Sequence, residues 1–132
     1  LRLALPQAVR WVLLQPQRGA FRHPMVVLHP QTSDPEALLE AARAWMEGSS
    51  EPLTVVILDN DHLTHTVQNW QMRHAALIRP VHLQEATLEQ LLQVFTHTGC
   101  DGLVVGADLP LLEGAGLERL LVLSRAPVLL VR

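Results

Sequence analysis

Short apolar runs alternate with segments of helical periodicity from Met25 onward, and this alternation limits the fold more than any other feature of the chain. Most of the runs are rich in Val, Leu and Ile, as expected for strands that are covered on both faces of a parallel sheet. Parallel strands joined through helices require right-handed crossovers, which place helices on both faces of the sheet. The runs are 25–29, 54–58, 78–83, 102–107 and 127–131.

We therefore expect residues 23–132 to form one doubly wound α/β domain. Numbered along the chain, its five parallel strands are expected in the order 3-2-1-4-5, with helices on both faces. The third run carries Pro80, which cannot donate a hydrogen bond to a neighbouring strand, so this run is predicted at a sheet edge. Capping pairs that mark the starts of two helices are Ser33 with Glu36 and Thr87 with Gln90.

Residues 1–22 do not fit this repeat. The segment 8–14 reads as an additional strand, and its surroundings at 3–15 echo the sequence at 121–132. It is either an ordinary edge strand or the last strand of a preceding, degraded copy of the domain. An apolar last strand left open at a sheet edge would expose unpaired backbone groups. We therefore predict that 8–14 pairs antiparallel with 127–131, within the chain or across a symmetric dimer.

Length and charge exclude several classes of function. The chain has 132 residues, which suits a single domain, and its formal net charge of -3 gives no positive field for nucleic acid. No apolar run approaches the roughly 20 residues that cross a bilayer, so this piece is not expected to insert into a membrane. Cys100 is the only cysteine, which excludes an intrachain disulfide and fits the cytoplasm, where we place the chain.

Two stretches near the end of the sequence carry a specific resemblance. GCDGLVVGAD at 99–108 and GAGLERLLVLSRAPVLLVR at 114–132 are similar to the ending of universal stress proteins. In that family an apolar strand reaches a glycine, and a helix opening with Gly-Ser/Thr leads into a closing Pro-Val-Leu-Val-Val strand. The resemblance extends over 25–132, in its middle part as a pattern only. It implies that the last strand is the edge through which copies commonly dimerise.

The residues with which ATP-binding members of that family hold the nucleotide are largely missing. Those members end the first strand with aspartate and follow the fourth strand with Gly-x2-Gly-x9-Gly-Ser/Thr. Here His29 takes the aspartate position, Leu109 replaces the second glycine, and only four residues separate Leu109 from Gly114. Ala115 replaces the hydroxyl residue. Because the glycines admit phosphate to backbone N–H groups and the hydroxyl donates to it, we expect neither ATP nor another cofactor.

The candidate site lies where the loops leave the carboxyl ends of the strands, since ligands of doubly wound sheets bind there. Negative charge from Asp108 and Glu113 would oppose a polyphosphate in this crevice. His29 is expected to hydrogen-bond a loop carbonyl, with ligand binding or pH sensing as the alternative role. The crevice residues are His29, Leu58, Asp59, Gly106, Asp108 and Gly114.

Other chemically active residues form no convincing catalytic or metal-binding pattern. His62 and His65 share one helical face, but they lack the glutamate and the spacing of a zinc-binding helix, so no metal site is expected. The polar residues 59–61 are interpreted as turn and N-cap residues. Cys100 precedes a buried strand and has no neighbouring histidine to activate it. We therefore expect a protein that is not an enzyme.

The resulting hypothesis is a non-catalytic domain of the universal stress type that acts by protein association or regulation. Its partner would be a protein, in a homodimer or a tandem pseudo-dimer that forms through the last strand. Trp11, in the additional strand, could belong to such a surface. Two alternatives stay open at this point: a sensor that binds a small ligand or nucleotide in the altered crevice, and a cytoplasmic regulatory domain of a membrane transporter.

Overall fold

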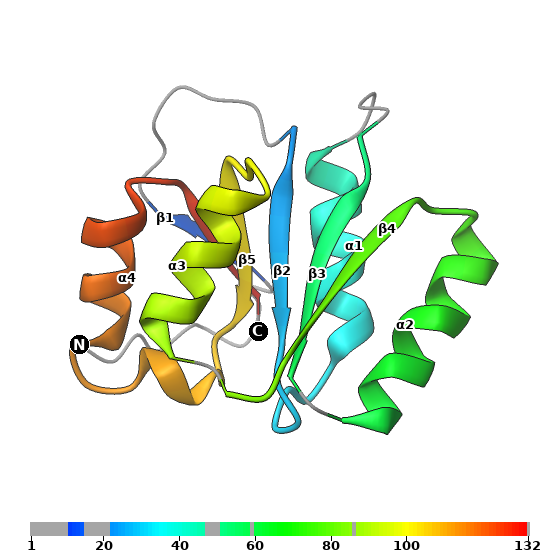
Figure 1. Cartoon of the computed structure of the whole chain (residues 1–132), viewed down its shortest axis with the longest axis horizontal. Coiled ribbons are helices and arrows are strands. Elements are labelled where there is room, and N and C mark those ends of the chain that lie inside the picture. The colour runs from blue at the N-terminus through cyan, green and yellow to red at the C-terminus, as the bar shows by residue number, and fades with distance from the viewer. Residues whose placement is uncertain (1–10, 15–21, 47–50, 59, 86, 132) are drawn as a thin grey trace.

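A six-stranded sheet with helices on both faces forms the protein (Figure 1). The computed structural model describes residues 11–14, 22–46, 51–58, 60–85 and 87–131. The strands are β1 (Trp11–Leu14), β2 (Pro24–Leu28), β3 (Leu53–Leu58), β4 (Ile78–Leu83), β5 (Gly102–Gly106) and β6 (Val128–Val131). The helices are α1 (Pro35–Trp45), α2 (Asp61–His74), α3 (Leu88–His97) and α4 (Gly116–Ser124), with a 3-10 turn, η1, at Pro110–Leu112.

The five parallel strands confirm the predicted order. The sheet runs β1-β6-β5-β2-β3-β4, so the five predicted strands lie as 3-2-1-4-5 and β1 is added beside the last of them. All residues of β2, β3, β5 and β6 are buried, which explains why these runs contain almost no polar residues. Thr54 on β3 is the exception among them.

The two faces of the sheet carry separate cores. Helices α1 and α2 cover one face, where Leu39, Val67 and Trp70 pack against β2, β3, β5 and β6. Helices α3 and α4 cover the other face, where Leu91 and Leu120 are buried (Figure 1). Trp70 is completely buried. None of the helices in the described ranges has the length and apolar composition needed to cross a bilayer.

The start of α1 differs from the prediction, and the start of α3 confirms it. The N-cap of α1 is Asp34, whose side chain accepts a hydrogen bond from the backbone N–H of Ala37 at 3.1 Å. The predicted cap, Ser33, lies one residue too early, because Pro35 already occupies the first helical position. At α3 the Thr87 hydroxyl accepts from the backbone N–H of Gln90 at 3.2 Å, as predicted.

Both edges of the sheet match the sequence-based expectation. β4 pairs only with β3 and carries Pro80 opposite Val55, at the edge where a missing donor does little harm. β1 pairs antiparallel with β6 inside the chain, with Trp11 opposite Val131. This confirms the predicted pairing for 11–14, while residues 8–10 lie outside the described part of the chain.

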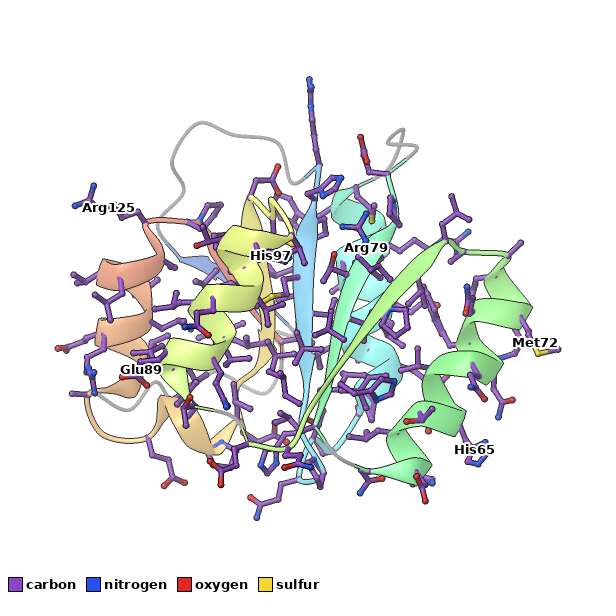
Figure 2. The ribbon with its side chains drawn as sticks, viewed as in Figure 1. His65, Met72, Arg79, Glu89, His97 and Arg125 are labelled. Carbon is purple, nitrogen blue, oxygen red and sulfur yellow. The ribbon has the colours of Figure 1, made fainter. Side chains whose placement is uncertain are left out.

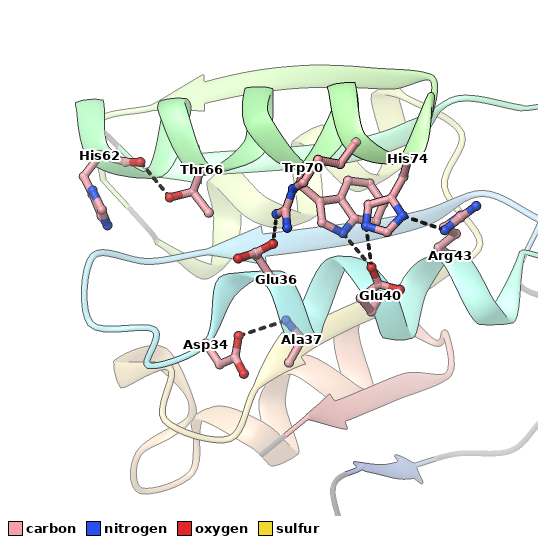
Figure 3. Close-up of polar contacts among 10 residues, drawn as sticks. Asp34, Glu36, Ala37, Glu40, Arg43, His62, Thr66, Trp70 and His74 are labelled. Carbon is pink, nitrogen blue, oxygen red and sulfur yellow. Dashed lines mark hydrogen bonds and ion pairs between the residues drawn. The ribbon is translucent and has the colours of Figure 1, made fainter.

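A polar cluster joins α1 to α2 on the outer side of their core (Figure 3). Glu40 on α1 accepts a hydrogen bond from the indole N–H of Trp70 at 2.8 Å and contacts Nε2 of His74 at 2.9 Å. Arg43 donates to Nδ1 of His74 at 2.9 Å, so the neutral ring carries its proton on Nε2 and donates it to Glu40. The Trp70 and His74 rings lie 4.8 Å apart.

Glu40 in this cluster provides the acceptor for the indole N–H of the buried Trp70, so removing Glu40 should measurably lower stability. Glu40→Ala should lower the free energy of unfolding by about 1–3 kcal/mol, because the Trp70 indole N–H loses its acceptor. Glu40→Gln keeps an acceptor oxygen at the same place and should cost clearly less. Urea denaturation followed by circular dichroism measures both. Equal midpoints for the two variants would show that the hydrogen bond to Trp70 contributes nothing.

Candidate functional site

The carboxyl ends of β2, β3 and β5 meet at one edge of the sheet, which is the lower edge in Figure 1. β2 leads into the loop that starts at His29, and β5 into the turn that contains Asp108 and η1. Strand order reverses between β2 and β5, so this is the place where doubly wound sheets bind ligands. Asp59, which follows β3, lies outside the described residues.

His29 is held by its own loop. Its Nδ1 accepts a hydrogen bond from the backbone N–H of Gln31 at 3.0 Å, and its carbonyl accepts from the N–H of Thr32 at 2.8 Å. The Thr32 hydroxyl accepts in turn from the N–H of His29 at 3.0 Å. The bond that Nδ1 makes is not the expected one to a loop carbonyl, because the turn directs an N–H group toward this nitrogen. One ring nitrogen is used in closing this turn.

Asp108 connects two loops that are far apart in the sequence. One carboxylate oxygen accepts a hydrogen bond from the backbone N–H of Ser33 at 3.0 Å, which joins the end of β5 to the approach to α1. The other lies over Gly106, where an added Cβ would come within 2.6 Å of it. Gly106 therefore makes room for the Asp108 carboxylate, and the negative group occupies space above the first glycine of the family motif.

The turn after β5 is packed into the core. Leu109 and Leu112 are 2% and 7% exposed and belong to the core shared by α3 and α4. Leu109 takes the place of the second glycine in the motif, so an apolar side chain points into the protein where the motif would need bare backbone. The sequence signal for this was the run Leu-Pro-Leu-Leu at 109–112, although the comparison with the family motif indicated only a lost glycine.

Backbone N–H groups along this turn donate to nearby carbonyl groups. The N–H of Leu109 donates to Gly106 at 3.1 Å, and that of Leu112 donates to Leu109 at 3.0 Å. The N–H groups of Glu113 and Gly116 continue the series, donating to Pro110 and Glu113, both at 3.1 Å. A phosphate-binding loop needs such groups to point at its ligand. In this turn these four are already paired.

Glycine is required most strictly at a position that the motif comparison did not single out. An added Cβ at Gly116 would lie 1.8 Å from the carbonyl oxygen of Leu111, so only glycine fits where α4 begins. Gly114, the predicted site residue, has a φ of +62° and open space around it. Ala115 precedes α4 and provides no side-chain cap, as its lack of a hydroxyl implies.

The remaining predicted residues do not join this crevice. Leu58 is only 3% exposed and packs in the core on the α3 and α4 side. Asn60 caps α2 by accepting from the N–H of Leu63 at 3.0 Å, which confirms its predicted role. His62 and His65 are exposed on α2, and His65 points away from the sheet (Figure 2). No three His, Cys, Asp or Glu side chains gather within the described ranges as a metal site would need.

Comparisons with known proteins show that this chain is similar to solved structures in its fold. No family model matches the sequence, and no curated protein matches it. A universal stress protein from Archaeoglobus fulgidus DSM 4304 superposes on 86% of this chain with a TM-score of 0.67 and 11% identity. A protein of the universal stress protein family from Burkholderia pseudomallei superposes on 85% of it with a TM-score of 0.56 and 19% identity.

The two structures differ in how much of them the chain spans. It covers 96% of the Burkholderia pseudomallei chain but only 44% of the Archaeoglobus fulgidus chain. Both superpositions extend over more than four fifths of this chain. Together with the strand order, they confirm the fold that the C-terminal motif indicated: the chain has the fold of the universal stress proteins.

Proposed function

We propose that this chain is a non-catalytic domain of the universal stress type that acts by associating with protein and does not bind ATP. The observation that carries the proposal is the packed turn after β5, where Leu109 and Leu112 fill the core and neighbouring N–H groups are paired locally. ATP-binding domains of this shape would use that turn to hold phosphate. In this chain the turn has a structural role.

Opening the turn for phosphate would be costly. Exposing a buried leucine costs roughly 1.5–3 kcal/mol, so moving both Leu109 and Leu112 would use much of the affinity of an ordinary ligand. The Asp108 carboxylate adds electrostatic repulsion toward a polyphosphate. Packing and charge therefore act in the same direction.

The crevice also offers little support for catalysis or for a small-ligand sensor. The functional groups of His29 and Asp108 accept hydrogen bonds from loop N–H groups and thereby hold the loops in place. The alternative of a regulatory domain attached to a transporter has no specific support among these contacts. Association is favoured instead by the edge of the sheet at β6, whose four residues are apolar and buried and whose backbone pairs with β1.

We expect isothermal titration calorimetry with ATP and magnesium to show no saturable heat. Asp108→Asn tests whether packing of the turn is enough to exclude ATP. The substitution removes the negative charge but leaves the turn packed, so the variant should not bind ATP either. A dissociation constant on the order of micromolar for the unaltered chain, equivalent to about 8 kcal/mol, would contradict the proposal. Binding by the Asn variant alone would show that charge, and not packing, excludes the nucleotide.

Leu109→Ala should destabilise the fold by about 2–5 kcal/mol, since it removes a buried side chain from a packed turn. Leu111→Ala, two residues further along the same turn and half-buried, is the matched control and should cost much less. Chemical denaturation of both variants measures the difference. If the two substitutions have the same effect, Leu109 does not anchor the turn.

The association itself is expected at the β6 edge. A chain that starts after residue 14 would leave β6 unpaired on that side and should form a dimer, with about twice the mass of the monomer. Light scattering coupled to size-exclusion chromatography measures that mass. A folded, truncated chain that stays monomeric at high concentration would count against association through this edge.

A further inference from the structure

β6 consists of four apolar residues, Val128, Leu129, Leu130 and Val131. In an antiparallel pair of identical strands, residues opposite each other direct their backbone groups alike, so the two-fold axis passes at a residue. With the axis at Leu129, that residue would lie opposite its own copy and Val128 opposite Leu130 of the copy, so that these pairs are all apolar. β6 is therefore complementary to itself in the antiparallel direction.

β1 occupies the position that such a copy would take. It runs antiparallel to β6 over all four residues, with Leu13 opposite Leu129 and Val12 opposite Leu130. Like β6, it consists of apolar residues only, Trp-Val-Leu-Leu. In direction, length and composition β1 thus substitutes for a second β6.

The backbone groups of β6 that face β1 can be identified. The carbonyl groups of Pro127 and Val131 accept hydrogen bonds from the N–H groups of Leu103 and Ala107 on the β5 side. Because successive backbone groups of a strand point to alternate sides, the N–H groups of Val128 and Leu130 point toward β1. The facing N–H groups of β1 belong to the opposite residues, Leu14 and Val12, whereas that of Leu13 points away from β6.

The connection between β1 and β2 favours pairing of β6 with β1 over pairing with a strand of a separate molecule. β1 ends beside Val128, at the end of the sheet where β2 begins, and the two are separated by three strand spacings, roughly 14 Å. Nine residues lie between β1 and β2 in the sequence, and nine residues can span about 30 Å when extended, which exceeds this separation. A strand tethered in this way has an effective concentration in the millimolar range, which a separate molecule seldom matches.

β1 is nevertheless a short strand at the edge of the sheet. Four residues form few ladder hydrogen bonds, each with a net contribution of about 1 kcal/mol, and local opening at such positions costs less than global unfolding. Release of β1 would leave β5, β2, β3 and β4 paired as before. The same domain can therefore exist with its β6 edge covered or open.

We propose that β1 is a built-in competitor for the β6 edge, and that a second copy of this chain binds through its own β6 only when β1 leaves. The proposal rests on the proposed function, in which β6 is the surface for association, and adds how access to that surface is controlled. If β1 and the β6 of a second copy have equal affinity for this edge, the tethered β1 occupies it. The intact chain is therefore monomeric at ordinary concentrations.

Two proline variants of the full chain test this directly. Val12→Pro removes an N–H that faces β6 and should release β1, whereas Leu13→Pro removes one that points away and should leave the pairing in place. Light scattering should give a dimer for Val12→Pro and a monomer for Leu13→Pro and the unaltered chain. Circular dichroism checks that both variants remain folded. A monomer for the Val12 variant, or the same state for both variants, would overturn the proposal.

A synthetic peptide of residues 8–15 provides a test that does not depend on those variants. Added in excess to the chain that lacks residues 1–14, it should restore the monomer by pairing with β6. If the truncated chain dimerises but the peptide and the proline variants have no effect, association through β6 stands and control by β1 fails. If the truncated chain is folded and monomeric, association through β6 fails as well.

Discussion

Burial of apolar parallel strands on both faces of the sheet is the constraint on which the rest of this structure depends. β2, β3, β5 and β6 contain buried residues throughout, and each needs cover above, below and along its backbone. The helices supply the cover above and below, on opposite faces. Along the backbone, β4 ends the sheet on one side with partly exposed residues and Pro80. On the other side β6 is too apolar to be an edge, and β1 covers it.

Contacts within the chain also hold the loops at the carboxyl ends of the strands. Asp108 joins the β5 turn to the loop before α1, His29 closes the loop after β2, and Leu109 and Leu112 extend the core into the turn. Polar and apolar groups that could have faced a ligand stabilise the loops. The proposed loss of the nucleotide site is therefore compatible with ordered loops at this place, because these contacts are made within the chain.

The sequence predicted those features that depend on local pattern. Continuous apolar runs identified the five parallel strands, Pro80 identified an edge, and the unassigned apolar segment identified the cover of β6. The features it did not predict depend on contacts between distant residues. The bond from Ser33 to Asp108 links positions 75 residues apart, and the contact of Gly116 with the Leu111 carbonyl depends on the path of the turn. Ser33 and Asp34 are both good caps, and only the position of Pro35 decides between them.

The central claim is that β6 is paired by β1 of the same chain, and hydrogen exchange of the Val128 and Leu130 amides tests it most directly. These amides face β1, while that of Leu129, between them, faces β5. The account predicts that all three are protected and that the protection of Val128 and Leu130 is unchanged when the protein is diluted. Rapid exchange at Val128 and Leu130 beside a protected Leu129, or protection that disappears on dilution, would contradict it.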